Sequence, residues 1–468
     1  MPFTHDKVPH NTRIPSVLLG YDTRNAIQGV QISETICCFI GQKAVGVGSA
    51  DLNKIYDIPT EQQAISLFGE GSNLHLQIRK ALETYASSRY RAIAIDDESA
   101  TAAAGTISIT GTATTGGALT ISIGGETAEV AISAQTSAET IAINLKNALE
   151  KRTLSVSITV TAGVITLTAI SKGAGGNTIS IGFLQDGASG IITSVENMSG
   201  GTDTGIDFEE VFKTLKGEKI DLVSFPYSLA NTISRNALTD YIKEVSGPIE
   251  QRPVIAISGI IGDLTATDAQ LPTTDNPRIV FANAKNSVEP IFQLTASITA
   301  LIASEPIPSI GHTNQVLPLN AMAGGYLRSE IEYLLRKGVT PLDNEQTGAL
   351  SVVRIISTET GGISAVYPGL WKRHLDFVRN AVREDVKTSF QKQKLTVTAA
   401  DRVRSVIFGT LKRLEEAPLE VVKNVDAHAS RLIVEPNPDN PGFLICRIPN
   451  DIVVPLYGMT GYIDLIIS

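Results

Sequence analysis

The sequence predicts a multidomain α/β protein, in which mixed α/β core domains carry an inserted β-rich domain and strand-forming terminal arms. Three observations predict this fold class. Strand and helix patterns alternate over residues 31–98 and again over residues 206–339. Residues 101–203 have another composition, because Thr, Ser, Gly, Ala and Ile dominate there and Phe183 is the single aromatic residue. The first and last residues have the composition of extended segments rather than of polar tails.

Size, charge and cysteine content limit the class of protein. A chain of 468 residues is too long for one hydrophobic core, so we expect about three domains. The net charge of −9 argues against nucleic-acid binding as the main task, because phosphate contacts need a basic surface. Early charged residues and the lack of long apolar windows predict neither a secretory signal nor a membrane span. Adjacent Cys37 and Cys38 are poorly placed to bridge each other, which with Cys446 predicts synthesis in a reducing cytoplasm.

An arm and an α/β middle domain account for most of the chain. Residues 1–22 predict an extended N-terminal arm, because Val8 and Ile14 precede prolines and are disfavoured in the α region. Residues 23–100 and 204–345 together predict the middle domain. Its strands are expected at 35–40, 91–95, 222–226, 254–257 and 279–281, and its helices at 61–67, 74–87, 208–215, 231–245, 287–304 and within 320–339. This spacing fits βαβ units around a mostly parallel sheet.

The inserted domain is predicted over residues 101–203 as a β-rich outer domain. Apolar and small polar residues alternate at 106–112, 119–124 and 158–168, as they do in half-buried strands. One helix is predicted at 137–152, where Ile141, Leu145 and Leu149 repeat every four residues. The glycine-rich run at 172–176 predicts a hairpin turn between two strands rather than a phosphate-binding loop.

Residues 346–468 predict a C-terminal domain that ends in a C-terminal arm. Its helices are expected at 368–394 and 400–415, and its strands at 352–357, 419–422, 443–448, 452–454 and 462–467. A terminal strand without a partner in its own chain can pair with the sheet edge of another subunit.

The sequence contains no convincing motif for catalysis or cofactor binding. The glycines at 41–48 lack the lysine of a P-loop, and those at 46–51 lack the third glycine of a dinucleotide fingerprint. The six histidines have no metal-ligand spacing, and the paired acids at 96–98, 209–210 and 415–416 lie at element boundaries. We therefore predict a protein that is not an enzyme, with no catalytic residues, no cofactor and no metal.

The helix predicted at 368–394 carries the most informative charge pattern. Its apolar stripe predicts a buried face formed by Leu375, Val378, Val382, Val386 and Phe390. Beside it lies a basic stripe formed by Lys372, Arg379, Arg383 and Lys387. Two interpretations stay open for the basic stripe, a solvated helix flank or a docking surface for an acidic partner.

Seven short segments follow one another in a characteristic order and spacing. They are RIP at 13–15, GYD at 20–22, GTISITG at 105–111, GVITLTA at 163–169, KGAGGN at 172–177, RSEIEYLLRKGVTP at 328–341 and VRIIST at 353–358. Together they make essentially the whole chain resemble the contractile tail sheath proteins of Mu-like phages.

This resemblance implies a structural and mechanical role. Sheath subunits of that family stack as six-fold rings helically around a tail tube, and contraction drives the tube through the host envelope. The implied partners are other copies of the chain, the tail tube protein, and the baseplate and tail terminator proteins, with no direct nucleic-acid contact and no membrane insertion. The implied location is the virion tail, after assembly in the host cytoplasm. A pyocin-like or type VI-like sheath of a tail-derived secretion or injection system stays open as an alternative.

The resemblance also implies roles for particular residues. Its terminal arms add strands to neighbouring subunits, and the candidates are Ile14, Val17, Leu18, Leu19, Tyr21, Tyr462, Ile463, Leu465, Ile466 and Ile467. The domain at 346–468 becomes the inner domain, so Lys372, Arg379, Arg383 and Lys387 become candidates for facing the tube. The insertion is expected to face outward and to be dispensable for contraction.

Overall fold

The computed structural model describes residues 34–459, except 45, 88, 96–97, 272–274, 323, 345–347, 365–368 and 391–393. These residues form two compact units. The larger unit contains Glu34–Asp376 together with residues from Val454 onward, and the smaller unit contains Phe377–Val453. The ten arm candidates at positions 14–21 and 462–467 lie outside the described residues, so their predicted role stays a prediction.

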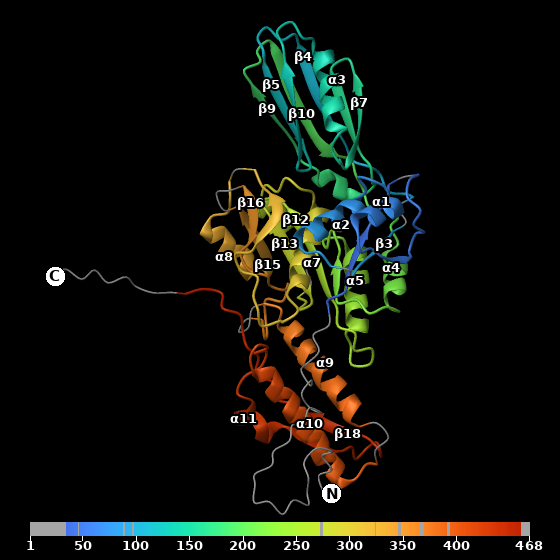
Figure 1. The fold of residues 1–468 in the computed structure, drawn as a ribbon, viewed down its shortest axis with the longest axis vertical. Helices are drawn as coiled ribbons and strands as arrows, with labels where there is room; N and C mark the ends of the chain where they lie inside the picture. Colours follow the sequence, from blue (N-terminus) through green and yellow to red (C-terminus); the bar gives the residue numbers. More distant parts are fainter. Residues whose placement is uncertain are drawn as a thin grey trace, which may run out of the picture. The chain divides into compact units, whose positions relative to one another are not determined.

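A nine-stranded sheet forms the centre of the larger unit (Figure 1). Its order is β14-β16-β15-β13-β12-β11-β1-β3-β2, and the six strands from β15 to β3 are parallel to one another. The strands are β1 (Cys37–Gly41), β2 (Ile55–Asp57), β3 (Tyr90–Ala94), β11 (Leu222–Ser224), β12 (Ile255–Ile261), β13 (Ile279–Ala284), β14 (Val316–Asn320), β15 (Val339–Asn344) and β16 (Ala349–Val352). The mostly parallel sheet expected from the sequence is confirmed.

Helices cover both faces of this sheet because its strands are apolar on both sides. One face packs against α1 (Glu61–Phe68), α2 (Asn73–Thr84) and α7 (Ile291–Ser304). The opposite face packs against α4 (Phe208–Leu215), α5 (Thr232–Val245), α6 (Leu264–Gln270) and α8 (Arg328–Arg336). Every residue of α7 from Ile291 to Ala303 is buried, which makes α7 the central helix of its layer. The helix expected within 320–339 is confirmed as α8, which is shorter than the expected range.

The insertion leaves the sheet after β3 and returns before α4 (Figure 1). It contains two antiparallel sheets, β10-β4-β8-β7 and β6-β5-β9, with α3 (Ala138–Leu149) packed against strands of both. The strands are β4 (Ala104–Gly111), β5 (Gly117–Ile123), β6 (Glu126–Ile132), β7 (Val156–Thr161), β8 (Val164–Ala169), β9 (Ile181–Asp186) and β10 (Ile191–Ser199). Ile141, Leu145 and Leu149 are buried against these strands, as their spacing predicts.

The base of the insertion fills the place where a sheet of this type usually binds a ligand. The strand order reverses direction at β1, with β3 on one side and β11 on the other, and ligands bind beyond the carboxyl ends of strands at such a switch point. Gln42, directly after β1, accepts hydrogen bonds there from Asn73 Nδ2 (2.9 Å) and Tyr227 Oη (3.2 Å). Gly173 of the insertion packs so closely that a Cβ would lie 2.5 Å from Gln42 Nε2. The run at 172–176 is thus not the expected hairpin turn, because it leads into the 3₁₀ turn η1 (Ala174–Thr178) between strands of two different sheets.

Two hydroxyl groups of the insertion cap helices of the larger sheet. Ser171 Oγ accepts a hydrogen bond from the Asn73 amide at the start of α2 (2.9 Å), and Thr178 Oγ1 accepts one from the Ile291 amide at the start of α7 (3.0 Å). The position before α7 is Pro290, whose side chain has no acceptor. The junction between the insertion and the nine-stranded sheet unit is therefore held by hydrogen bonds, and does not consist only of the two connecting chain segments.

Charged groups add to this junction. Arg79 of α2 forms an ion pair with Glu126 of β6, with an N–O distance of 3.1 Å. Glu289 is buried beneath Gly125 of the insertion and accepts hydrogen bonds from the backbone and side-chain amides of Asn320 (2.7 and 2.9 Å). Burial raises the pKa of the Glu289 carboxyl, while these hydrogen bonds oppose the shift.

The smaller unit combines helices with one short hairpin. It contains most of α9 (Trp371–Ser389), then α10 (Val397–Glu415), α11 (Val425–His428), the 3₁₀ turn η2 (Ala429–Arg431), β17 (Ile433–Pro436) and β18 (Leu444–Arg447). The two long helices confirm the predicted pair. The strands expected at 352–357, 419–422 and 452–454 are wrong, since β16 ends at Val352 and Val422 and Ile452 form only an isolated bridge. Apolar β-branched residues predicted these strands, but the segments lie in irregular chain.

Candidate assembly surface

The four predicted tube-facing residues all lie on α9, but they differ in exposure. Arg383 and Lys387 are exposed, whereas Arg379 is half-buried. Lys372 belongs to the larger unit, and its ammonium lies 4.4 Å from the centre of the Trp371 ring. Two of the four, Arg383 and Lys387, therefore present their charge to solvent one helical turn apart in the smaller unit.

The first turn of α9 is fixed to the larger unit by charged groups. Asp376 binds Arg278 through both carboxylate oxygens, at 2.5 and 2.9 Å, and both residues are buried. Arg373 donates from Nη2 to the carbonyl groups of Ile302 and Glu305 at the end of α7. Burial lowers the pKa of Arg373 to about 10, so it remains cationic at neutral pH. Burial and this cation lower the pKa of His312 to about 4, so that imidazole is neutral there.

Within the smaller unit, α9 and α10 are joined by one carboxylate. Asp385 of α9 accepts a hydrogen bond from Thr410 Oγ1 (2.5 Å) and forms an ion pair with Arg413, both on α10. On the predicted apolar stripe of α9, Val378 and Val382 are buried as expected, whereas Leu375, Val386 and Phe390 are only half-buried. The exposed cations Arg383 and Lys387 thus stand on a helix whose Asp385 is bonded to α10.

The hairpin β17–β18 is a surface that the charge pattern did not reveal. Within the described part of the chain its two strands pair only with each other, from Ile433 opposite Arg447 to Pro436 opposite Leu444. Ile433, Phe443 and Ile445 expose their apolar side chains beside this sheet. A two-stranded sheet is marginal alone, and its outer edges carry unpaired backbone groups. The sequence signal was the predicted strand at 443–448, read without its partner.

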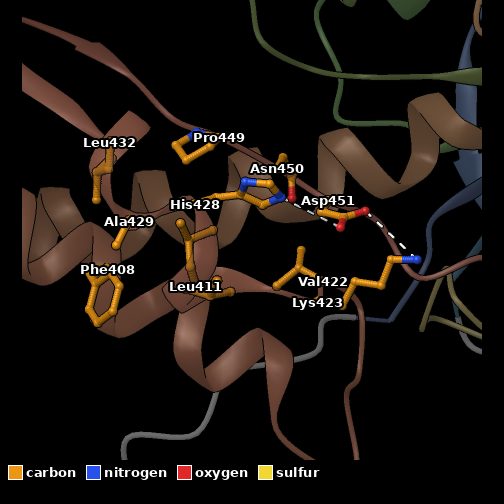
Figure 2. Close-up of a pocket in the computed structure, with 11 residues that line it drawn as sticks. Phe408, Leu411, Val422, Lys423, His428, Ala429, Leu432, Pro449, Asn450 and Asp451 are labelled. Carbon is orange, nitrogen blue, oxygen red and sulfur yellow. Dashed lines mark ion pairs between the residues drawn. The ribbon is translucent and has the colours of Figure 1, made fainter.

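The segment after β18 returns along α10 and closes a small hollow, shown in Figure 2. The hollow has a volume of about 280 Å³, including space open to solvent. Asp451 forms ion pairs with His428 (3.8 Å) and Lys423 (3.9 Å), and it accepts a hydrogen bond from Asn424 Nδ2 (2.8 Å). The Lys423 amide donates to the Asp451 carbonyl (2.8 Å), so the returning chain is held by backbone and side-chain bonds. These contacts position the segment and do not resemble a catalytic arrangement.

The outer strand β14 of the nine-stranded sheet is protected against strand addition. Pro318 in the middle of β14 has no amide hydrogen, and its carbonyl already accepts a hydrogen bond from Lys80 Nζ (2.9 Å). Proline and lysine are the usual means of blocking such edges. In the hairpin β17–β18 the proline, Pro436, stands at the last position of β17 rather than in the middle of a strand.

The described residues offer no candidate metal site and no membrane-spanning helix. No three His, Cys, Asp or Glu side chains gather there in a way that could hold a metal ion. None of the described helices combines the length and the apolar character needed to cross a bilayer.

Comparison with known proteins gives similar sequences and folds among tail sheath proteins. No family model matches the chain. Two solved structures share its fold at 14% sequence identity: a sheath tail protein from Listeria innocua (TM-score 0.51, covering 92% of this chain and 97% of the other) and one from Desulfitobacterium hafniense (TM-score 0.52, covering 94% and 97%). The fold is that of tail sheath proteins.

A relative found by sequence is a tail sheath protein of the Mu-like type. The chain is 22% identical to the Mu-like prophage FluMu tail sheath protein of Haemophilus influenzae, over 96% of this chain and 95% of the relative. The resemblance to Mu-like tail sheath proteins, expected from the seven sequence segments, is confirmed.

Proposed function

We propose that this protein is the structural subunit of a contractile tail sheath. In this role it polymerises as stacked six-fold rings around a tail tube, and its contraction drives the tube through the host envelope. The similarity to a Mu-like tail sheath protein over 96% of the chain supports this proposal, as does the shared fold.

The observation that carries the proposal is the hairpin β17–β18. It presents two short strands that pair only with each other among the described residues, and exposed apolar side chains lie beside them. Such an edge can accept a strand from another subunit, because main-chain hydrogen bonds and apolar contacts then complete the sheet. The arms at residues 1–22 and from residue 460 onward are our candidates for these donated strands.

Each part of the chain receives a role in this proposal. The domain predicted at 346–468 acts as the inner domain, which carries the connections between subunits; of its residues, Phe377–Val453 form the smaller compact unit, whereas those up to Asp376 belong to the larger one. Arg383 and Lys387 face the tube. Residues 23–100 and 204–345 form the middle domain, and the insertion at 101–203 faces outward. The further partners are the tail tube, baseplate and tail terminator proteins, and the complete particle assembles in the host cytoplasm as part of a virion tail.

Electron microscopy and sedimentation of the purified protein test the proposal. We expect rings or tubes from the full chain, because the arms and the hairpin complete one another between copies. Variants that lack residues 1–20 or 460–468 should remain folded subunits by circular dichroism but should no longer polymerise.

Two results contradict the proposal in different ways. If the full-length protein stays monomeric while it is concentrated slowly, the sheath role is excluded. Truncated variants that still form tubes leave the sheath role intact but exclude strand exchange through the arms.

A further inference from the structure

The chain returns to the larger unit immediately after it leaves the smaller one. Val453 still belongs to the smaller unit, where its amide donates to the Val421 carbonyl (3.0 Å). From Val454 onward the chain belongs to the larger unit. Pro455 packs against Gly311 so closely that a Cβ on that glycine would lie 3.0 Å from the proline Cβ.

Tyr457 lies in a notch of the larger unit that is formed by two separate segments. The guanidinium carbon of Arg354, just after β16, lies 3.7 Å from the centre of the Tyr457 ring, which is a close cation–π contact. Gly369, just before α9, leaves room for the phenol, since a Cβ there would lie 2.7 Å from Tyr457 Oη. Gly369 also has a φ of +131°, which favours glycine.

The residues beside Tyr457 point the other way. Leu456 and Met459 are 88% and 93% exposed, whereas Tyr457 is half-buried, and burial raises the pKa of its phenol. Among Leu456, Tyr457 and Met459, only the tyrosine is turned toward the protein. Tyr457 and Pro455 together hold the segment against the larger unit.

We propose that Arg354 and Tyr457 clamp the C-terminal segment to its own subunit, so that only the chain beyond Tyr457 is available to a neighbouring copy. The partner is the hairpin β17–β18 of a second copy, and this part of the inference rests on the proposed sheath function. The clamp shortens the free linker, which raises the effective concentration of the segment that follows it. Arg354 acts here as a positioning residue.

Limited digestion with chymotrypsin tests the clamp in the unassembled full chain. In the wild type, cleavage after Tyr457 should be slow because its ring is held in the notch. In Arg354→Ala it should become about tenfold faster, as expected for the loss of one cation–π contact. Cleavage after Phe443, which is 60% exposed, serves as an internal standard in both proteins.

Two variants separate the clamp from general damage. Arg447→Ala removes an exposed arginine elsewhere and should leave cleavage at Tyr457 unchanged. Arg354→Lys keeps a cation and should fall between the wild type and Arg354→Ala. Equal cleavage at Tyr457 in the wild type and Arg354→Ala overturns the clamp, whereas faster cleavage at both Tyr457 and Phe443 indicates unfolding and also counts against a specific clamp.

The assembly arm of the test uses Tyr457→Ala. Without the clamp, the linker before the strand predicted at 462–467 runs from 454 to 461 instead of from 458 to 461, which is about twice as long. A linker of twice the length lowers the effective concentration of that strand about threefold, so the critical concentration for polymerisation should rise by about that factor. Leu456→Ala, at the exposed neighbouring position, should not change it. A wild type that never polymerises refutes the sheath function but leaves the digestion result to decide on the clamp. A wild-type critical concentration in Tyr457→Ala refutes the role of the clamp in assembly.

Discussion

Thr178 and Ser171 are capping residues for helices to which they do not belong. The first amides of a helix have no acceptor within the helix, and a hydroxyl group usually supplies one from the preceding residue. Here the hydroxyl groups come from positions 113 and 98 residues away in the chain. Thr178 Oγ1 also donates to the Gly175 carbonyl (2.6 Å), so its orientation is fixed from both sides. α2 also has its own cap, since Ser72 Oγ accepts a hydrogen bond from the His75 amide (3.2 Å), so the insertion adds to the capping of α2 and supplies the side-chain cap of α7.

Substitution of Thr178 by valine tests this dependence at nearly constant volume. The loss of one cap costs about 1 kcal/mol, so hydrogen exchange of the first amides of α7 should become roughly fivefold faster. The measurement is hydrogen–deuterium exchange followed by mass spectrometry of peptides that cover residues 289–296. Thr159→Val, at an exposed position on β7, is the matched control and should leave these peptides unchanged. Unaltered exchange in Thr178→Val would mean that the cap is energetically irrelevant.

At the residue scale, the sequence predicts exposed positions along one helix, but it does not predict which residues from different elements contact one another. The helical repeat placed Arg383 and Lys387 together on one helix, and the structure shows both exposed. Asp385 on α9 bonds to Thr410 and Arg413, which belong to the next helix along the chain, α10. Only the placement of α9 beside α10 brings these three residues together. The Arg354–Tyr457 contact joins positions about a hundred residues apart, for which spacing along the chain carries no signal.

At the scale of elements, periodic patterns predict helices and strands well where burial is one-sided. The helix α3 and the long helices α9 and α10 follow their apolar stripes. Isolated apolar runs mislead: the segment at 353–357 has β-branched residues and lies beside β15, where the Val353 amide donates to the Pro341 carbonyl (3.1 Å), but it forms no regular strand ladder. Four strands were missed, β2, β14, β15 and β16. β2 is only three residues long, and β14 and β15 are interrupted by Pro318 and Pro341, although the burial of β14 alternates. Strand pairing is a property of the whole sheet, so such segments cannot be assigned one at a time.

The exposed basic residues of α9 allow a test of the predicted tube-facing surface. The double substitution Arg383→Glu and Lys387→Glu should lower assembly on tail tubes at least about tenfold, because a like charge then faces an acidic partner. Co-sedimentation with purified tubes measures this effect, and the yield of tubes without a core reports separately on contacts between subunits.

A control on another surface has the same change in charge. Lys213→Glu with Lys243→Glu alters exposed residues of α4 and α5 in the larger unit and should bind tubes normally. If both double variants lose binding equally, net charge rather than the α9 surface explains the effect. Normal binding by the α9 variant supports the alternative that this helix flank is merely solvated.

At the scale of the whole molecule, the insertion has a base that belongs to the sheet and a distal end that does not. The base includes the caps Ser171 and Thr178, the close approach at Gly173 and the Arg79–Glu126 ion pair. The distal end lies at the other ends of the strands, in turns such as 133–136. Composition predicted a separate β-rich domain, but it could not show which of its residues contact the sheet. The expectation that the insertion is dispensable stays a prediction, and it now depends on where the chain is cut.

Insertion of a flexible segment at either end distinguishes these two regions. Eight Gly and Ser residues placed after Ala134 should change the free energy of unfolding by less than about 0.5 kcal/mol, because that turn is exposed. The same segment placed after Gly175 should cost about 2 kcal/mol or more, since two caps of about 1 kcal/mol each are displaced. Urea unfolding monitored by circular dichroism measures both. Equal tolerance at the two positions contradicts a structural role for the base.

The difference between the blocked edge of β14 and the open edges of β17–β18 has a consequence for the protein before it assembles. Newly made copies accumulate at high local concentration, and any exposed sheet edge then competes for incoming strands. Because Pro318 and Lys80 remove β14 from this competition, disordered aggregation through the largest sheet is disfavoured. The same two residues thus favour both solubility of the free subunit and ordered growth at this edge of the sheet. Pro318→Val should expose the conflict as amorphous precipitate formed alongside regular polymer.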